Sequence, residues 1–548
     1  MPRQAAGKAD LIVHARRIHT MDRARPSVSA VAVAGGGIVA VGSRRQMQQW
    51  KGRKTAVLEA PDAVGVPAFT DCHTHLFNWA CRLNQLDLAG VGSLGRVLRR
   101  LGKRSEQTAH GEWLVAGGFD LTLLDEGGAG STPRRLLDRS VGERPAMVKS
   151  RDGHSAWLNS AGLRAAGITA RTVTPAGGRI ERDGRGKPTG IVQENALSLV
   201  PNPSDMLSDG QIRSGMGRAI RRAHRFGVTT VHSLEDRRAF EWFTRLRQGG
   251  RLGLRVCWAP PAGLLDHARQ MGLKTGFGDD FLWIGGVKLF ADGALGSQTA
   301  YMYGSYPGRR GYCGVATCVG KRLRDQVVEA AKAGLASWIH AIGDRANHEA
   351  LMALAAARRV EPTRLIHRVE HAQCVRPADV RRFAELGVVA SMQPCHLPGD
   401  IALADRYWPR VRRRAYPFRS LVAAGVPVAF GSDVPVETMD PIFGIHAAVN
   451  RQDQDDQPAG GWYPTERITA RQALAAYTVG AARAGGRDAL AGPGAPGPVA
   501  SKRMGRLLPG MAADITLLSE DVLRVPPRHI KDVRVVATVF DGRVVYRR

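Results

Sequence analysis

The stretch Pro67-Ala68-Phe69-Thr70-Asp71-Cys72-His73-Thr74-His75 decides how this sequence is interpreted. The apolar run over 64–72 has the length of a buried strand, and two histidines follow at its end. Side chains at positions i and i+2 of an extended chain point to the same side, so both imidazoles can face one metal ion. A single His-x-His pair also occurs by chance in loops, so the hypothesis needs support from elsewhere in the chain.

Further apolar runs of strand length follow this stretch and alternate with helical patterns. Such alternation favours parallel β/α units. Eight strands, most of them followed by a helical stretch, predict an α/β protein built on a (β/α)₈ barrel. The predicted strands are 64–72, 227–233, 253–258, 283–290, 335–340, 365–371, 387–392 and 426–432.

The remaining segments predict additions to this barrel. Residues 76–226 are too long for one crossover, and they contain the strand-like Ala146–Lys149 and a Gly-rich hairpin pattern at 177–190, so we expect an inserted subdomain. Short β-branched runs with glycine turns occur at both ends of the chain and predict one small β domain. These runs are 10–19, 29–42, 55–60, 512–518, 533–540 and 543–546. The expected divisions are 1–63 and 505–548 for the β domain, 64–484 for the barrel, and a Gly/Pro linker at 485–504.

The composition is that of a folded chain. Hydrophobic residues at 44% and charged residues at 23% exclude disordered, collagenous and coiled-coil proteins. No run of roughly eighteen uninterrupted apolar residues is present, which predicts no membrane span, and the start MPRQAAGKAD lacks the apolar core of a signal peptide. Seven cysteines without a CxxC pair are typical of reduced thiols, so we expect a cytoplasmic protein.

The net charge of +29 is the unusual part of the composition. Such a charge could attract nucleic acid, anionic lipid or an acidic substrate. Only 12 of the 78 basic residues are lysines, and the arginines are spread over the chain without zinc-finger spacing, an RNP-like aromatic strand or a heptad-plus-basic helix. We therefore interpret the charge as an arginine-rich solvated surface, with an anionic partner as the alternative.

Lys288 lies inside the apolar strand 283–290, where burial disfavours an ammonium group. One interpretation is a lysine that extends to solvent at the strand end or pairs with Asp292. The other is a neutral amine that adds CO₂ and becomes a carbamate, which can bridge two metal ions as a carboxylate would.

Three more metal-type residues follow later strands: His340, His371 and Asp433. Taken singly, each histidine could be a buried core residue, and the aspartate could cap a helix. With the first-strand pair and Lys288 they place six such residues at the carboxyl ends of strands one, four, five, six and eight. Barrel enzymes build their active sites at these ends, so the set predicts a metal-dependent active site.

The order of these residues resembles the amidohydrolase superfamily with a binuclear metal centre. The surrounding segments are similar to its amidohydrolase-3 branch, the YtcJ-like and N-substituted formamide deformylase-like proteins. The resemblance runs over about 10–546, and the segments that carry it are PAFTDCHTHL, SRDGHSAWLNSAGL, GGVKLFADGALGSQTA, WIHAIGDRANHEAL, HRVEHAQ, GSDVPVETMDP and LLPGMAADITLL. It implies a distorted (β/α)₈ TIM-like barrel, an inserted subdomain and a β-sandwich that joins both termini. Ala68 departs from the glycine usual in the family, and the segment 491–503 is longer than usual.

The resemblance also implies the metal centre. The two histidines of the first strand and the aspartate would hold the more buried ion, the other two histidines the second, and a carboxylated lysine would bridge them. A hydroxide between the ions would be the nucleophile, and the aspartate would move its proton to the departing nitrogen. Zinc suits these ligands, although iron and manganese fit the same ligand types. The implied ligands are His73, His75, Lys288, His340, His371 and Asp433.

Five other polar residues are weaker candidates for substrate binding. His154 could reach the barrel mouth or only stabilise the insert, and Glu194 could be an alternative metal ligand or an ordinary surface residue. Asp292 could orient a ligand or cap a helix. Gln393 and His396 follow strand seven, where loops that face the substrate begin.

The sequence therefore predicts a metal-dependent hydrolase of carbon–nitrogen bonds other than peptide bonds, with a linear amide or an N-substituted formamide as substrate. A deaminase or an ester or lactone hydrolase could use the same centre. An alternative from another class is a protein that binds nucleic acid or another polyanion and keeps the barrel without its catalytic function. Its affinity for the polyanion would fall steeply with salt concentration. The expected partner is a small-molecule substrate, which in one alternative is anionic. By analogy with similar barrels, we also expect a second copy of the chain as a partner.

Overall fold

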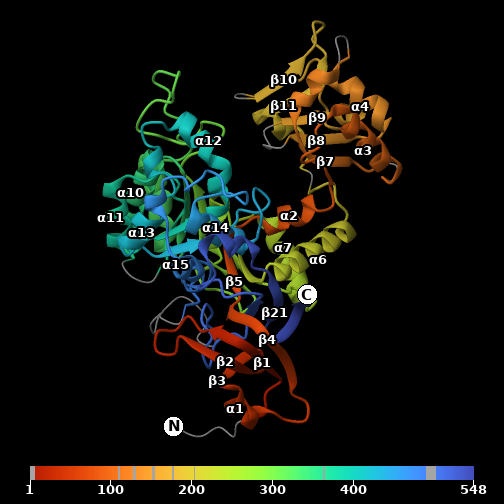
Figure 1. The fold of residues 1–548 in the computed structure, drawn as a ribbon. Coiled ribbons are helices and arrows are strands. Elements are labelled where there is room, and N and C mark those ends of the chain that lie inside the picture. Colours follow the sequence, from red (N-terminus) through yellow and green to blue (C-terminus); the bar gives the residue numbers. More distant parts are fainter. Residues whose placement is uncertain are drawn as a thin grey trace. The chain divides into compact units, whose positions relative to one another are not determined.

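The computed structural model of the chain describes residues 7–108, 111–127, 131–150, 155–175, 178–202, 204–361, 365–488 and 502–548 (Figure 1). These residues form an α/β fold with four sheets. The chain divides into two compact units, one made of Met1–Leu76 with Ile220–Arg548 and the other of Phe77–Ala219. No described helix is long and apolar enough to cross a membrane.

Two parallel sheets form the centre of the first unit. The four-stranded sheet has the order β14-β13-β12-β5 and the five-stranded sheet the order β15-β16-β17-β18-β19. Isolated parallel bridges, Thr74 with Val434 and Pro261 with Lys288, connect the edges of the two sheets. The strands are β5 (Phe69–Thr74), β12 (Val228–Ser233), β13 (Arg255–Trp258), β14 (Leu282–Ile284), β15 (Val287–Phe290), β16 (Ser337–Ala341), β17 (Arg368–His371), β18 (Val389–Met392) and β19 (Val428–Phe430).

Every predicted strand of this region overlaps an observed one, but two of the predicted runs are divided between two strands. The run 64–72 covers the end of β4 (Ala56–Pro67) and the start of β5, because the chain changes sheets at Ala68, whose N–H bonds Asp514 O. The run 283–290 is interrupted at Gly285 and Gly286. A Cβ on Gly285 would lie 2.4 Å from both Cys257 Sγ and the Trp338 ring, so the backbone passes too close to these side chains for any residue but glycine.

Helices follow most of these strands, as the alternating pattern predicted. In α10 the buried positions Ala346, Ala350, Leu354 and Ala357 recur every three or four residues and form one apolar stripe. The helices are α6 (Asp209–Arg225), α7 (Arg237–Gln248), α8 (Leu265–Gln270), α9 (Gly320–Lys332), α10 (Asp344–Val360), α11 (Pro377–Leu386), α12 (Leu397–Tyr407), α13 (Phe418–Ala423), α14 (Pro441–Asn450), α15 (Ala470–Ala475) and α16 (Ala481–Ala484).

Both ends of the chain share one seven-stranded sheet of order β22-β21-β20-β4-β1-β2-β3. The red N-terminal strands and the blue β21 accordingly lie close together in Figure 1. A buried ion pair of 2.7 Å between Arg255 Nε and Asp514 Oδ2 ties this sheet to β13. The elements are β1 (Leu11–His19), β2 (Ser27–Ala34), β3 (Gly37–Gly42), α1 (Arg44–Met47), β4, β20 (Ile515–Leu518), β21 (Val535–Phe540) and β22 (Arg543–Arg547).

The second unit contains a six-stranded mixed sheet of order β10-β11-β9-β8-β7-β6, with α3 and α4 beside it (Figure 1). The predicted strand at 146–149 is observed as β8, and the predicted hairpin at 177–190 as the antiparallel pair β10–β11. Of the predicted linker 485–504, residues 489–501 lie outside the described residues. The elements are α2 (Leu76–Arg82), β6 (Leu86–Asp87), α3 (Leu94–Glu106), β7 (Leu114–Phe119), α4 (Pro133–Val141), β8 (Ala146–Ser150), β9 (Ser155–Leu158), α5 (Ser160–Ala165), β10 (Gly178–Arg182) and β11 (Pro188–Glu194).

The close packing at the break between β14 and β15 predicts a stability effect. Replacing Gly285 by alanine should cost about 1–3 kcal/mol, because the new methyl group has to displace Cys257 or Trp338. The same replacement at Gly263, where an added Cβ would meet no atom within 4 Å beyond its chain neighbours, is the matched control. Thermal unfolding measures both; an unchanged melting temperature in G285A would contradict the proposed constraint.

Candidate metal centre

Five of the six predicted ligands lie close together at or just after the carboxyl ends of the parallel strands, and Lys288 lies on β15. His73 lies on β5 and His75 directly after it, while Asp433 follows β19. The metal-binding atoms of His73, His371 and Asp433 all lie within 4.8 Å of one another. His75 Nε2 is 3.1 Å from Asp433 Oδ1, and the His340 and His371 rings are 4.5 Å apart.

Three of the imidazoles have one nitrogen fixed by a hydrogen-bond acceptor. His73 Nδ1 lies 2.7 Å from Glu370 Oε2, His371 Nδ1 lies 2.8 Å from Gln393 Oε1, and His340 Nε2 lies 3.0 Å from Gly293 O. Because each of these oxygens accepts, the bonded nitrogen carries the proton and the other ring nitrogen has a free lone pair. Neutral imidazoles held in this way are typical metal ligands.

Asp433 supplies the oxygen ligand of the group. Its Oδ1 is buried, and among the described residues no hydrogen-bond donor is aligned with it. A buried carboxylate oxygen without a donor is costly unless a cation satisfies it. The donor set of imidazole nitrogens and a carboxylate therefore fits a divalent transition-metal ion.

The backbone turns sharply where two of these residues leave their strands. His371, Ala372 and Asp433 have φ values of 73°, 44° and 60°, in the left-handed region that residues with a side chain rarely adopt. The N–H of Asp433 bonds His73 O at 2.7 Å, and the carboxylate of Asp71 accepts the N–H groups of His73 and Ser432. These bonds hold the end of β19 against the end of β5.

Burial sets the protonation of the histidines. It lowers the pKa of His73 to about 4 and that of His340 to about 3, and it holds the pKa of His371 well below its ordinary value. Burial would also lower the pKa of His75, but the Asp433 carboxylate, 3.1 Å from its Nε2, raises it. Near neutral pH the first three rings are therefore in the unprotonated form that binds metals.

Lys288 is only 3% exposed, and its Nζ lies 4.8 Å from the centre of the Phe290 ring. Burial lowers the pKa of this amine to about 8. A lysine in this environment carries an appreciable neutral fraction near physiological pH, and only the neutral amine can add CO₂.

The weaker sequence candidates divide into two groups. Asp292 accepts the N–H groups of Tyr301, Ile342 and Gly343, and its Oδ1 is 3.6 Å from His340 Nε2, so it organises the loops beside that histidine. Gln393 orients His371, and His396 Nε2 lies 4.0 Å from Asp433 Oδ2. His154 and the side chain of Glu194 lie outside the described parts of the chain.

Sequence reasoning missed the polar layer that supports the histidines. It consists of Arg368, Glu370 and Ser391, which are all buried and are joined by hydrogen bonds. The available signal was the alternation Arg368-Val369-Glu370 inside a predicted strand, which directs two opposite charges to one side of an otherwise apolar element.

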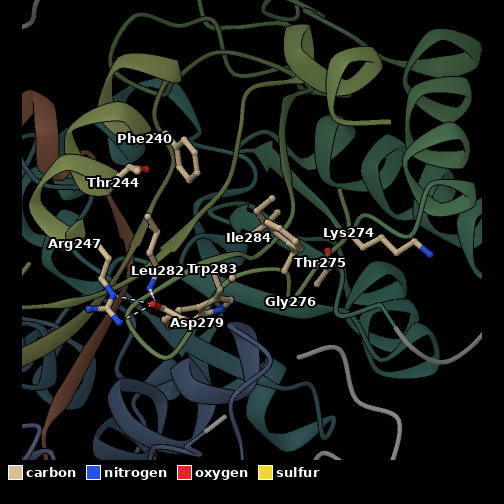
Figure 2. Close-up of a pocket in the computed structure, with 12 residues that line it drawn as sticks. Phe240, Thr244, Arg247, Lys274, Thr275, Gly276, Asp279, Leu282, Trp283 and Ile284 are labelled. Atoms are coloured by element: carbon tan, nitrogen blue, oxygen red, sulfur yellow. Dashed lines mark hydrogen bonds and ion pairs between the residues drawn. The ribbon is translucent and has the colours of Figure 1, made fainter. Parts of the chain in front are cut away.

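Two of the cavities bear on the function, and none of the six ligands lines either of them. One, of about 710 Å³, is bordered by α7, residues 274–279 and β14; Figure 2 shows its wall, with Arg247 paired to Asp279 at 2.7 Å. The other, of about 530 Å³, is bordered by Met302 and by residues 304–310 and 407–411, with Arg309, Arg310 and Arg410 in its wall. Asp344, which follows β16, also lines the second cavity and so places it near the carboxyl ends of the strands.

Comparison with known proteins finds relatives that match nearly the whole chain. A curated relative, Protein LONG AFTER FAR-RED 3 of Arabidopsis thaliana, is 31% identical over 98% of this chain and 92% of its own length. N-substituted formamide deformylase of Arthrobacter pascens is 26% identical over 98% of both chains. The crystal structure of an uncharacterized metal-dependent hydrolase from Pyrococcus horikoshii OT3 superposes with a TM-score of 0.78 at 26% identity, covering 95% of this chain and 99% of that one.

The predicted family is confirmed by a family model that matches residues 57–546, nearly the whole chain, and is described as the amidohydrolase family. A metal-dependent hydrolase among the solved structures and a deformylase among the relatives agree with the predicted hydrolase class. The chain belongs to the amidohydrolase family.

Proposed function

We propose that this protein hydrolyses the carbon–nitrogen bond of a linear amide, such as an N-substituted formamide, at a metal centre formed by the six residues. The observation that carries the proposal is the approach of His73, His371 and Asp433 ligand atoms to within 4.8 Å of one another, around a buried carboxylate oxygen. The similarity to an N-substituted formamide deformylase supports the substrate class.

We propose the following arrangement for the centre and its support. His73, His75 and Asp433 would hold one divalent ion, and His340 and His371 would hold a second. Lys288, as a carbamate, would be a ligand of both, and zinc is the metal that this donor set suits best. The two parallel sheets form one distorted (β/α)₈ barrel over 64–484, with 76–226 inserted and with 1–63 and 505–548 as one β-sandwich.

Bound divalent ions would lower the pKa of water and polarise the substrate carbonyl. The residues of the chain then have separate tasks. The Asp433 carboxylate stays ionised although burial opposes it. One of its oxygens accepts the proton of the attacking water and returns it to the departing nitrogen of the substrate. Gln393 and Glu370 hold His371 and His73 by their Nδ1 atoms. His396, 4.0 Å from Asp433 Oδ2, is placed to contact the substrate beside the acid.

The surroundings suggest two further features of this function. The cavity with Arg309, Arg310 and Arg410 would suit an acyl or amine group that carries a carboxylate, so an anionic amide is part of the proposal. The seven free thiols support a cytoplasmic location.

A substrate panel tests the function itself. The purified protein should release amine and acid together from N-alkyl formamides and other linear amides, each offered with and without a carboxylate. Release of ammonia alone would instead support a deaminase, and release of alcohol from esters or lactones would support the other alternative. Product analysis by mass spectrometry distinguishes the three, and turnover of none of these compounds would reject the proposal.

Replacing Asp433 by asparagine should lower kcat by roughly 10²–10⁴-fold while KM changes little, because the amide keeps the shape but cannot accept the proton. Steady-state kinetics on the best substrate of the panel measure this effect. Replacement of Asp400 by asparagine, a half-buried carboxyl bonded to Tyr416 instead of the ligands, is the matched control. If D433N keeps the wild-type kcat, the aspartate has no part in proton transfer.

Replacing Lys288 by alanine should abolish turnover, and acetate or propionate should partly restore it by supplying a carboxylate in the vacated space. Lys274→Ala, which removes an exposed lysine at the 710 Å³ cavity, should leave turnover unchanged. Full activity of K288A without added carboxylate would eliminate the bridging role. Intact-mass measurement of the wild type in CO₂-buffered, mild conditions provides a second check on the carbamate.

A further inference from the structure

Glu370 occupies an unusual position directly behind the metal centre. It lies on β17, is 0% exposed, and its Oε2 is 2.7 Å from Nδ1 of His73. A carboxylate buried to this degree is costly, and an apolar side chain could fill the same space without that cost. The presence of a charge here therefore calls for a task that an apolar residue cannot perform.

Besides His73, two described side chains hydrogen-bond the Glu370 carboxylate, and both donate to it. Arg368 donates from Nε to Oε1 at 2.7 Å and from Nη2 to Oε2 at 3.0 Å, and Ser391 Oγ donates to Oε2 at 2.6 Å. An ionised carboxylate only accepts, so the remaining contact requires the proton of the imidazole to lie on His73 Nδ1. The lone pair is then on Nε2, the nitrogen that lies 3.5 Å from Asp433 Oδ1.

Arg368 has further contacts besides those with Glu370. Its guanidinium lies 3.8 Å from the centre of the Trp338 ring, and it also donates to His232 Nδ1 and to the carbonyl of Cys72. The Cys72 carbonyl belongs to β5, the strand that carries His73. The arginine therefore joins β17 to β5 and keeps the carboxylate at a fixed place beside the imidazole.

We propose that Glu370, held by Arg368, is a positioning residue that locks His73 in the tautomer and orientation with Nε2 facing Asp433. This inference rests on the metal centre of the proposed function, because the locked nitrogen is one of its ligands. Glu370 does not touch substrate. It acts by making the His73 lone pair available before a metal ion arrives, as carboxylates behind ligating histidines do in general.

The tautomer can be measured in the wild-type protein without any change to this pair. Metal-free full-length protein with ¹⁵N-labelled histidine should show His73 protonated at Nδ1, with the signal assigned by its loss in His73→Ala. A His73 that is protonated at Nε2, or that exchanges between both forms, would overturn the proposal. This outcome does not depend on activity, on metal loading or on the folding of a Glu370 variant.

Cobalt(II) titration of the metal-free chain gives the second measurement. Glu370→Gln should weaken Co²⁺ binding by about 10–100-fold, read from the visible absorption of the bound ion and from chelator competition. Asp379→Asn, which changes a buried carboxylate that contacts His348 and Arg376 and none of the six ligands, is the matched control and should keep the wild-type Co²⁺ affinity. Wild-type affinity in a folded E370Q protein would refute the positioning role.

A variant without either charge controls for misfolding. Arg368→Met together with Glu370→Leu leaves no unpaired buried charge, a type of change that proteins often tolerate. This protein should unfold near the wild-type temperature and still bind Co²⁺ about 10–100-fold more weakly. Wild-type affinity in it would refute the role. Should the wild type itself bind no metal, the proposed function fails, while the tautomer measurement still decides whether Glu370 orients His73.

Discussion

The dense packing of buried imidazoles around one buried carboxylate is the constraint on which the rest of the structure depends. His73 and His75 both approach Asp433 Oδ1, at 3.5 and 3.1 Å, and the His371 ring lies 4.7 Å from that of His73. Desolvation lowers the pKa of His73 and His371, so these rings are neutral and few N–H groups are available to bond the Asp433 carboxylate. Such a group is satisfied by a metal cation, and the surrounding fold is arranged to keep it together.

The fold meets this constraint with strained and tightly joined backbone at the strand ends. Left-handed residues occur at His371 and Asp433, and the carboxylates of Asp71 and Asp292 each bind backbone N–H groups from separate loops. Behind them, Arg368 and Glu370 replace an apolar core by a charged layer. Residues that strain or charge the interior in this way are concentrated at functional sites, where the precise direction of a side chain matters more than stability.

The sequence predicted the strands and the residues that meet, because both depend on local patterns. Each of the six side chains follows or lies near the end of a recognisable apolar run, and parallel strands bring such ends to the same edge. Their role as ligands stays a proposal. The alternation of apolar runs and helical patterns was likewise visible, and the structure confirms an α/β fold with parallel central sheets.

Other features depend on contacts between distant parts of the chain and so could not be predicted. The break between β14 and β15 follows from the Trp338 ring and the Cys257 sulfur, which press on Gly285 from other strands. The change of sheet at Ala68 depends on Asp514, more than four hundred positions later. Arg368 and Glu370 were visible as charges in a strand, but their task depends on the burial and the direction of His73, which only the folded chain defines.

The most direct measurement of the central claim is an anomalous difference map from crystals of the protein grown with zinc and recorded on both sides of the zinc absorption edge. The account predicts two peaks among the six side chains, one bounded by His73, His75 and Asp433 and one by His340 and His371, with continuous density joining Lys288 to both. Absence of any peak among these residues, with zinc bound elsewhere or not at all, would contradict it.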